Sequence, residues 1–224
     1  MTKNGVSVMV KLPQTDIYAI TCEKLSRGRD NLEVVKQLLA AGVKIIQYRE
    51  KEKTKKEKYR QCLALSKMCR EAGALFIVND DVDIAILTDA GGIHVGQDDL
   101  PADAVRKLVG PKMIIGVSAG TPQEAADAVE HGADYLGVGP VFGTGTKEDA
   151  GKPVGLDFLK FVAQKYRLPL VAIGGINADN IHLVSGAGIK YFAMISALVA
   201  ADDITAAVHG LRRRLKAREN FLTD

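Results

Sequence analysis

The sequence predicts an α/β protein with the (β/α)₈ architecture of a TIM barrel, built as a single domain of 224 residues. Eight short apolar runs rich in β-branched residues alternate with longer amphipathic runs. The apolar runs are hydrophobic at nearly every position, which is typical of parallel strands that are buried on both faces. Eight strand–helix units in a chain of this length indicate a closed barrel.

The eight predicted strands are spread along most of the chain. In order, they cover residues 16–21, 44–50, 75–80, 92–96, 113–119, 135–140, 169–175 and 191–196. Amphipathic patterns between them predict helices, most clearly over 32–41, 55–71 and 122–131. Each of these three patterns is followed within a residue or two by glycine, which commonly ends a helix.

An open, doubly wound sheet is the alternative architecture for such an alternation. That fold normally uses fewer strands and has a glycine-rich turn directly after the first one. Here the first predicted strand, 16–21, continues into Cys22, Glu23 and Lys24 without a glycine. The sequence therefore favours the barrel.

Two terminal segments lie outside the predicted barrel. Residues 1–15 are an N-terminal extension whose apolar run is broken by Lys11 and which lacks a small-residue cleavage site, so we expect no signal peptide. Residues 212–224 are a basic C-terminal helix or tail, which we interpret as the solvated face of a last helix. Binding of this tail to an acidic partner is the alternative interpretation.

The composition argues against several classes of protein. No apolar stretch approaches the length needed to cross a bilayer. A net charge of +3 and an aromatic content of 5% do not indicate nucleic-acid binding. Three cysteines without a CxxC spacing predict reduced thiols rather than disulfides or a zinc site. We expect a cytoplasmic protein without a membrane or nucleic-acid partner; a homo-oligomer is compatible with the sequence.

Polar residues stand where the predicted strands end. In a barrel of parallel strands these ends meet at one mouth, where the active sites of such barrels lie. Gln47 and Arg49 lie inside an otherwise apolar run, Asn79 is near the end of the third run, and Ser118 lies in the fifth. Because buried polar groups need partners, these side chains are candidates for binding a ligand. We interpret His94, within the fourth run, as a structural histidine.

Two aspartates at neighbouring strand ends predict a metal site. Asp80 closes the third strand and Asp99 follows the fourth. Mg²⁺ prefers oxygen ligands and is usually held by one or two carboxylates together with substrate phosphates. The structural alternative is that such aspartates cap the next helices, but for these two residues we favour the role of metal ligand.

Two groups of residues predict anion binding at the same mouth. The first group follows the last two strands, where such barrels bind phosphate through backbone N–H groups, and consists of Gly175, Ile195 and Ser196. The second group combines the metal site with the cations Arg49, Lys51 and Lys147. Lys147 belongs to a loop after the sixth strand that also carries Thr144 and Thr146. Two phosphorylated substrates, one of them bound with a metal, suggest a transferase.

Within a stretch of resemblance from about Ile17 to Leu198, seven motifs occur in unbroken order: QYREK, VNDDVDIA, GIHVGQDDLP, GVSAGT, GADYLGVGPVFGTGTKEDAGKPVGL, VAIGGI and MISAL. Together they resemble the thiamine phosphate synthase (thiamin-phosphate pyrophosphorylase) family. The resemblance implies a (β/α)₈ barrel that uses Mg²⁺. It also implies a reaction between 4-amino-2-methyl-5-hydroxymethylpyrimidine diphosphate and 4-methyl-5-(2-phosphoethyl)thiazole, which gives thiamine phosphate and pyrophosphate.

The resemblance also implies a role for individual residues. The pyrimidine diphosphate would be bound by Gln47, Tyr48, Arg49, Glu50, Lys51, Asn79, Ser118 and Lys147. The thiazole phosphate would be bound by Thr144, Thr146, Gly175, Ile195 and Ser196. Mg²⁺ would be held by Asp80 and Asp99. The catalytic residues would be Lys147, Ser118, Arg49 and Lys51.

The implied chemistry requires no protein nucleophile. The electron-rich aminopyrimidine releases pyrophosphate to form a stabilised cation, which the thiazole nitrogen then captures. The enzyme has to stabilise the charge on the departing pyrophosphate and align the acceptor. Three alternatives remain open: a related barrel that isomerises the thiazole phosphate without a metal or a second substrate, a non-catalytic sensor of phosphates of the thiamine pathway, and an unrelated phosphate-binding barrel, which the QYREK and NDD motifs disfavour.

Overall fold

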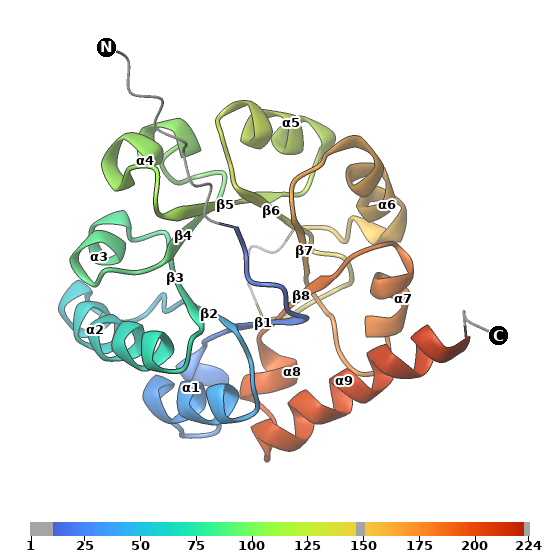
Figure 1. Cartoon of the computed structure of the whole chain (residues 1–224), viewed down its shortest axis with the longest axis horizontal. Helices are drawn as coiled ribbons and strands as arrows, with labels where there is room; N and C mark the ends of the chain where they lie inside the picture. Colours follow the sequence, from blue (N-terminus) through green and yellow to red (C-terminus); the bar gives the residue numbers. More distant parts are fainter. Residues whose placement is uncertain (1–10, 147–150, 222–224) are drawn as a thin grey trace, which may run out of the picture.

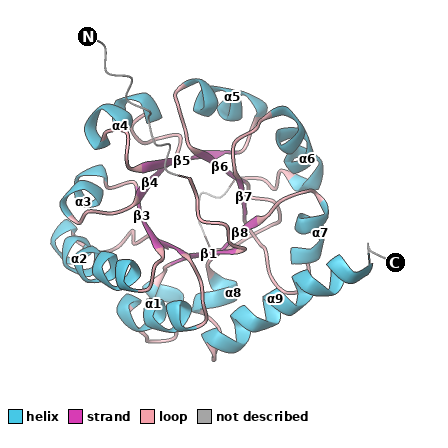
Figure 2. Ribbon diagram, in the orientation of Figure 1, coloured by secondary structure: helices cyan, strands magenta, loops and turns pink. Residues whose placement is uncertain are grey.

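The computed structural model describes residues 11–146 and 151–221. Within these residues, eight parallel strands close into a barrel in the order in which they occur in the sequence (Figure 1). Figure 2 shows the strands as an inner ring with the helices around it. The predicted (β/α)₈ fold is confirmed.

The strands lie where the apolar runs predict them. They are β1 (Ile17–Ile20), β2 (Ile45–Tyr48), β3 (Leu75–Asn79), β4 (Gly92–Val95), β5 (Ile114–Ala119), β6 (Tyr135–Val138), β7 (Leu170–Ile173) and β8 (Tyr191–Met194). Every strand is shorter than its predicted run, because residues at the ends of the runs belong to the loops. The barrel closes through β1, whose Tyr18 pairs with Ile45 on one side and Ala193 on the other.

The helices form the outer ring. They are α1 (Asn31–Ala40), α2 (Lys55–Glu71), α3 (Val82–Leu87), α4 (Ala102–Val109), α5 (Pro122–Glu130), α6 (Gly155–Lys165), α7 (Ile181–Gly186), α8 (Ser196–Val199) and α9 (Ile204–Phe221), with a 3₁₀ turn, η1 (Glu23–Leu25). The three predicted helical patterns correspond to α1, α2 and α5. Helix α2 begins with a capping box in which Thr54 and Glu57 satisfy each other's backbone N–H groups.

Successive residues of each strand face opposite sides of the barrel wall. One hydrophobic cluster fills the interior and includes Tyr18, Ile45, Ile77, Ile114 and Tyr135. A larger cluster packs the outer faces of the strands against the helices. Further along the same inward-facing rows, polar residues replace the apolar ones near the carboxyl ends of the strands: Gln47, Asn79, His94 and Ser118. The interior therefore changes from apolar to polar towards one mouth.

The opposite, N-terminal end of the barrel includes parts of both predicted terminal segments. Leu12 is only 6% exposed and packs in the interior cluster, so the segment before β1 contributes to the core. Arg212 lies within α9 and pairs with Asp16, which differs from the interpretation of a wholly solvated basic tail. Arg213 is exposed, as that interpretation predicts. In the described part of the chain, no helix is long and apolar enough to cross a membrane.

Candidate active site

A pocket opens at the carboxyl ends of the strands. Four of the predicted pyrimidine-diphosphate ligands line it: Gln47, Arg49, Asn79 and Ser118. They come from β2, β3, β5 and the loop after β2, and strand alternation directs them inward. The carbonyl oxygen of Ser118 accepts a hydrogen bond of 2.6 Å from the Gln97 side chain. The structure therefore brings together residues that are far apart in the sequence.

The predicted thiazole-phosphate ligands line the other half of this pocket. They are Thr144, Thr146, Gly175, Ile195 and Ser196. The Thr146 hydroxyl lies 3.4 Å from the Ser196 hydroxyl. The backbone N–H of Thr146 donates to the Thr144 hydroxyl at 3.2 Å. The loop after β6 is thus joined to the start of α8, and the described residues of this half of the pocket offer hydroxyl and backbone groups rather than charges.

Two glycines allow the loops after β6 and β7 to pack closely. Gly174 and Gly175 have φ values of 100° and 65°, in the region that favours glycine. A Cβ atom on Gly175 would lie 2.6 Å from the Gly143 carbonyl oxygen, so a larger residue would push the two loops apart. The Asn180 side chain donates to the Gly175 carbonyl at 2.8 Å. Backbone strain and close contact both explain this glycine pair.

Arg49 brings a positive charge to the pocket. Its backbone is fixed by Thr21, whose hydroxyl accepts from the Arg49 N–H at 3.0 Å. Within residues 11–146 and 151–221, no hydrogen bond or ion pair engages its guanidinium group. Because guanidinium is suited to bidentate recognition of phosphate, Arg49 can bind an anionic ligand in this pocket.

Asp80, Asp99 and Lys51 lie beside the pocket rather than in its lining. The Lys51 Nζ atom is 2.6 Å from Asp80 Oδ2, and Asp99 Oδ2 accepts from the Gly96 N–H at 2.8 Å. Burial raises the pKa of Asp99, and the neighbouring Asp80 carboxylate raises it further. Two hard oxygen ligands close together fit Mg²⁺. The described residues contain no group of three or more His, Cys, Asp or Glu side chains that could hold a metal ion.

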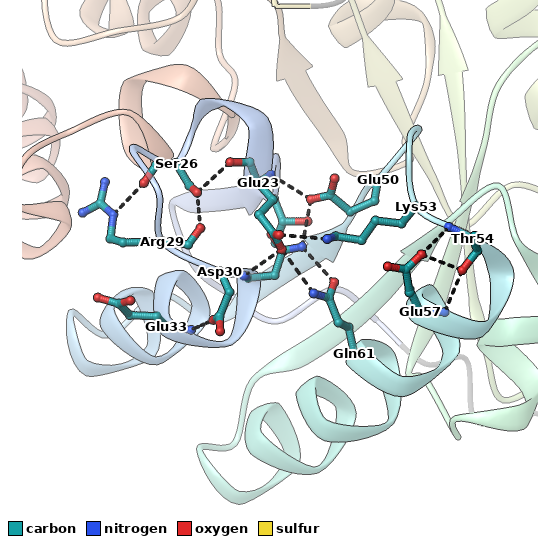
Figure 3. A network of polar contacts seen from close by, with 12 residues as sticks. Glu23, Ser26, Arg29, Asp30, Glu33, Glu50, Lys53, Thr54, Glu57 and Gln61 are labelled. Carbon is teal, nitrogen blue, oxygen red and sulfur yellow. Dashed lines mark hydrogen bonds and ion pairs between the residues drawn. The ribbon is translucent and has the colours of Figure 1, made fainter.

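Two of the predicted ligands are directed away from the pocket. Tyr48 packs in the outer cluster and donates to Gln61 Oε1 at 2.8 Å. Glu50 accepts 2.8 Å hydrogen bonds from the Glu23 N–H and the Asn31 side chain, as part of the polar network in Figure 3. The physical reason is strand alternation, because neighbours of inward-facing Gln47 and Arg49 face the helices. The side chains of Tyr48 and Glu50 are therefore engaged outside the pocket, and a role of these two residues in binding the pyrimidine diphosphate stays a prediction from the resemblance.

The predicted catalytic residue Lys147 lies outside the described residues. Its neighbour Thr146 lines the pocket, as does Thr144. The role of Lys147 stays a prediction from the sequence.

Three polar side chains of the pocket were not predicted as functional: those of Tyr18, His94 and Tyr135. They link Gln47 to Ser118 through side-chain hydrogen bonds of 2.8 to 3.0 Å. Glycine at two inward-facing strand positions leaves room for the rings. A Cβ on Gly116 would lie 2.0 Å from the Tyr135 ring, and one on Gly137 would lie 2.9 Å from the His94 ring. Glycine inside a predicted strand was the sequence signal of such a close approach.

Comparisons with known proteins agree with this geometry. Residues 17–198 match the family described as thiamine monophosphate synthase. A thiamine-phosphate synthase of Pelotomaculum thermopropionicum is 53% identical over 93% of this chain and 96% of its own length. One from Caldicellulosiruptor bescii is 47% identical over 98% and 99%.

A solved structure gives the same result. The thiamine phosphate pyrophosphorylase of Pyrococcus furiosus superposes with a TM-score of 0.83 at 37% identity, over 91% of this chain and 96% of that one. The family match, the high identity along nearly the whole chain and the shared barrel point to one conclusion. The chain belongs to the thiamine monophosphate synthase family.

Proposed function

We propose that this chain is a thiamine phosphate synthase. It transfers the pyrimidinylmethyl group of 4-amino-2-methyl-5-hydroxymethylpyrimidine diphosphate to 4-methyl-5-(2-phosphoethyl)thiazole, and it releases pyrophosphate. The observation that carries the proposal is one pocket with two unlike halves, lined by nine of the residues that the sequence predicts for two phosphorylated substrates, in a chain of this family. Relatives of nearly the same length carry the same activity in their names.

The pyrimidine diphosphate binds on the side of β2 to β5. Gln47 and Asn79 offer amide groups that suit the polar edge of a pyrimidine. Arg49 and Ser118 offer donors for the diphosphate, and the predicted role of Lys147 is to complete this set. Tyr48 and Glu50 support the site indirectly, because their side chains fix the wall and the loop that carry Gln47 and Arg49.

The thiazole phosphate binds on the side of β6 to β8. Barrels of this class commonly bind a phosphate between the loops after β7 and β8 and a short extra helix, and α8 is such a helix. Gly175, Ile195 and Ser196 belong to those loops. Thr144 and Thr146 offer hydroxyls from the loop after β6, beside Ser196. Among the described residues this cradle is neutral, and it binds the phosphate that is not expelled in the reaction.

The metal proposed for the site is Mg²⁺, held by Asp80 and Asp99. When bound, it neutralises charge on the diphosphate and assists its departure. Lys51, paired with Asp80 at 2.6 Å, adds a positive charge beside the metal site. Arg49, Ser118 and Lys147 hold the leaving group, and the opposite half of the pocket aligns the thiazole nitrogen for attack on the cation. Cytoplasmic location and oligomeric state stay predictions.

The proposal is tested by pyrophosphate release from the purified protein. The pyrimidine diphosphate is supplied with and without the thiazole phosphate, in Mg²⁺ and in EDTA. We expect release that requires both substrates and the metal. Release without Mg²⁺ would remove the metal from the proposal. No release, with the thiazole phosphate still bound, would instead indicate the isomerase or the sensor.

A further inference from the structure

Five side chains form a continuous hydrogen-bonded chain across the barrel interior. In order, they are Gln47, Tyr18, Tyr135, His94 and Ser118. We propose that the donors in this hydrogen-bonded row all point in one direction, from Gln47 to Ser118. The row then holds the Ser118 hydroxyl proton towards the pocket. Tyr18, Tyr135 and His94 are then positioning residues that act through Ser118.

The direction is set at the Gln47 end. The Gln47 Nε2 atom donates to the Tyr18 hydroxyl at 2.8 Å. An amide nitrogen is only a donor, so the Tyr18 oxygen accepts here and its own proton must go elsewhere. Tyr18 is 1% exposed, and the Tyr135 hydroxyl lies 2.8 Å away as its acceptor. Because a buried hydroxyl proton without an acceptor is costly, Tyr18 donates to Tyr135.

The same argument fixes the protonation of His94. Tyr135 accepts from Tyr18, so its proton goes to His94 Nδ1 at 2.9 Å. An Nδ1 atom that accepts carries no proton, and the ring is therefore neutral with its proton on Nε2. The Nε2 atom lies 3.0 Å from Ser118 Oγ and donates to it. Burial raises the pKa of both tyrosines, which keeps their protons in place at neutral pH.

The other protonation states of His94 are incompatible with this order of hydrogen-bond donors and acceptors. If Nδ1 carried a proton, in the other tautomer or in the imidazolium, it would donate to Tyr135. Tyr135 would then donate to Tyr18, whose oxygen would accept twice. The Tyr18 proton would have no acceptor among the described residues. Only the neutral ring protonated at Nε2 gives both tyrosine hydroxyls an acceptor while Gln47 donates.

The consequence concerns the role of Ser118. A serine beside a histidine is commonly activated as a nucleophile, which requires a ring nitrogen that accepts the serine proton. Here the ring nitrogen donates, so Ser118 keeps its proton and offers it to the pocket. A hydroxyl fixed as a donor suits an anionic group such as the oxygen of a departing diphosphate. The same arrangement disfavours a covalent serine intermediate.

The packing of the Tyr18, Tyr135 and His94 rings maintains the direction of hydrogen-bond donation from Gln47 to Ser118. Tyr135 is completely buried, and its ring centroid lies 5.5 Å from that of His94 and 6.1 Å from that of Tyr18. Gly116 and Gly137 leave the space that the two rings fill. A rotation of either ring would therefore require a shift of the barrel wall.

The first test reads the His94 tautomer in the substrate-free protein by ¹⁵N NMR of the ring nitrogens. The His94 signal is identified as the one that a His94→Gln variant lacks. We expect a protonated Nε2 and an unprotonated Nδ1. A proton on Nδ1 would overturn the proposal, because it would mean that Gln47 turns its oxygen to Tyr18. This measurement requires no substrate, so it stands even if the proposed synthase activity fails.

The second test rests on the proposed function and uses Tyr135→Phe. This variant removes the donor to His94 Nδ1, so we expect a mixture of ring tautomers. We expect kcat for pyrophosphate release to fall roughly tenfold, with KM for the thiazole phosphate unchanged. Tyr191→Phe is the matched control, because Tyr191 packs against the interior cluster at the start of β8 and is not one of the five hydrogen-bonded side chains. An unchanged kcat in Tyr135→Phe, or an equal fall in both variants, would overturn the proposal.

Discussion

Arg212 and Arg49 lie at opposite ends of the barrel and differ in the partners of their guanidinium groups. At the N-terminal end, the Arg212 guanidinium makes a bidentate pair with Asp16 at 2.8 and 3.0 Å. It also donates to the carbonyl oxygens of Ala41 and Gly42, at 2.7 and 3.0 Å. At the carboxyl end, the Arg49 guanidinium has no such partner within the described residues and lines the pocket.

This difference separates groups that stabilise the fold from groups that bind ligands. Arg106 repeats the first pattern at the N-terminal end, where it contacts Asp134 and two backbone carbonyls. A partly buried guanidinium without a partner is unfavourable until an anion supplies the missing bonds. For the partly buried Arg49, Arg106 and Arg212, the pairing state therefore indicates the role, and the position of Arg49 agrees with the placement of active sites at the carboxyl face of such barrels.

Arg49→Met gives the largest expected effect. It keeps much of the side-chain volume and removes the charge. We expect kcat/KM for the pyrimidine diphosphate to fall roughly 100- to 1,000-fold, as for the loss of a preorganised donor. The free energy of unfolding should stay the same or rise, because no internal partner is lost. The measurements are pyrophosphate release and urea unfolding, with exposed Arg213→Met as the control. A large loss of stability would contradict the comparison.

Asp99→Asn tests the metal site at the same end. The amide keeps the shape of the side chain but is a weaker ligand for Mg²⁺. We expect the Mg²⁺ concentration for half-maximal activity to rise at least roughly 10- to 100-fold, a change that even indirect partners of a metal produce. Asp98→Asn is the matched control, since Asp98 is the exposed neighbour. Equal Mg²⁺ dependence in the two variants would remove Asp99 from the metal site.

The sequence predicts the fold well because the fold depends on local patterns. Apolar runs and glycine stops indicate strands and helices without knowledge of distant contacts. It also predicts most of the pocket, because residues at strand ends must meet at one mouth. Gln47, Arg49, Asn79 and Ser118 are found there on this argument alone.

The residues that the sequence does not predict depend on contacts between distant strands. Tyr48 and Glu50 belong to the same motif as Gln47, but alternation turns their side chains towards the helices. The hydrogen bond between Tyr135 and His94 joins residues 41 positions apart, so no local sequence pattern predicts it. Direction of a side chain and long-range pairing both require the closed barrel.

Arg212→Met is the counterpart at the N-terminal end. The pair with Asp16 is only partly exposed, at 24% and 30% of the two side chains. We expect the free energy of unfolding at pH 7 to fall by about 1–3 kcal/mol, which allows for solvent screening of the pair. Activity per folded molecule should stay unchanged. Urea unfolding and pyrophosphate release measure the two quantities, again with Arg213→Met as the control.

The smallest expected effect is the pH dependence of the stability that Arg212→Met loses. Burial alone would raise the pKa of Asp16, but the hydrogen bonds from Arg212 and the Ile17 N–H, with the charge of Arg212, lower it below its ordinary 3.8. A carboxyl whose pKa is lower in the folded state adds stability above its unfolded pKa and loses it as the pH falls through the folded value.

The stability difference between the native protein and Arg212→Met should therefore shrink below about pH 4. Unfolding in urea, measured from neutral pH to about pH 3, gives this difference directly. Asp16→Asn tests whether the Asp16 carboxylate causes this pH dependence. In that background, Arg212→Met should lower the free energy of unfolding by the same amount at every pH. If the difference between native protein and Arg212→Met stayed constant on acidification, its origin would lie in the carbonyl contacts of Arg212 rather than in Asp16.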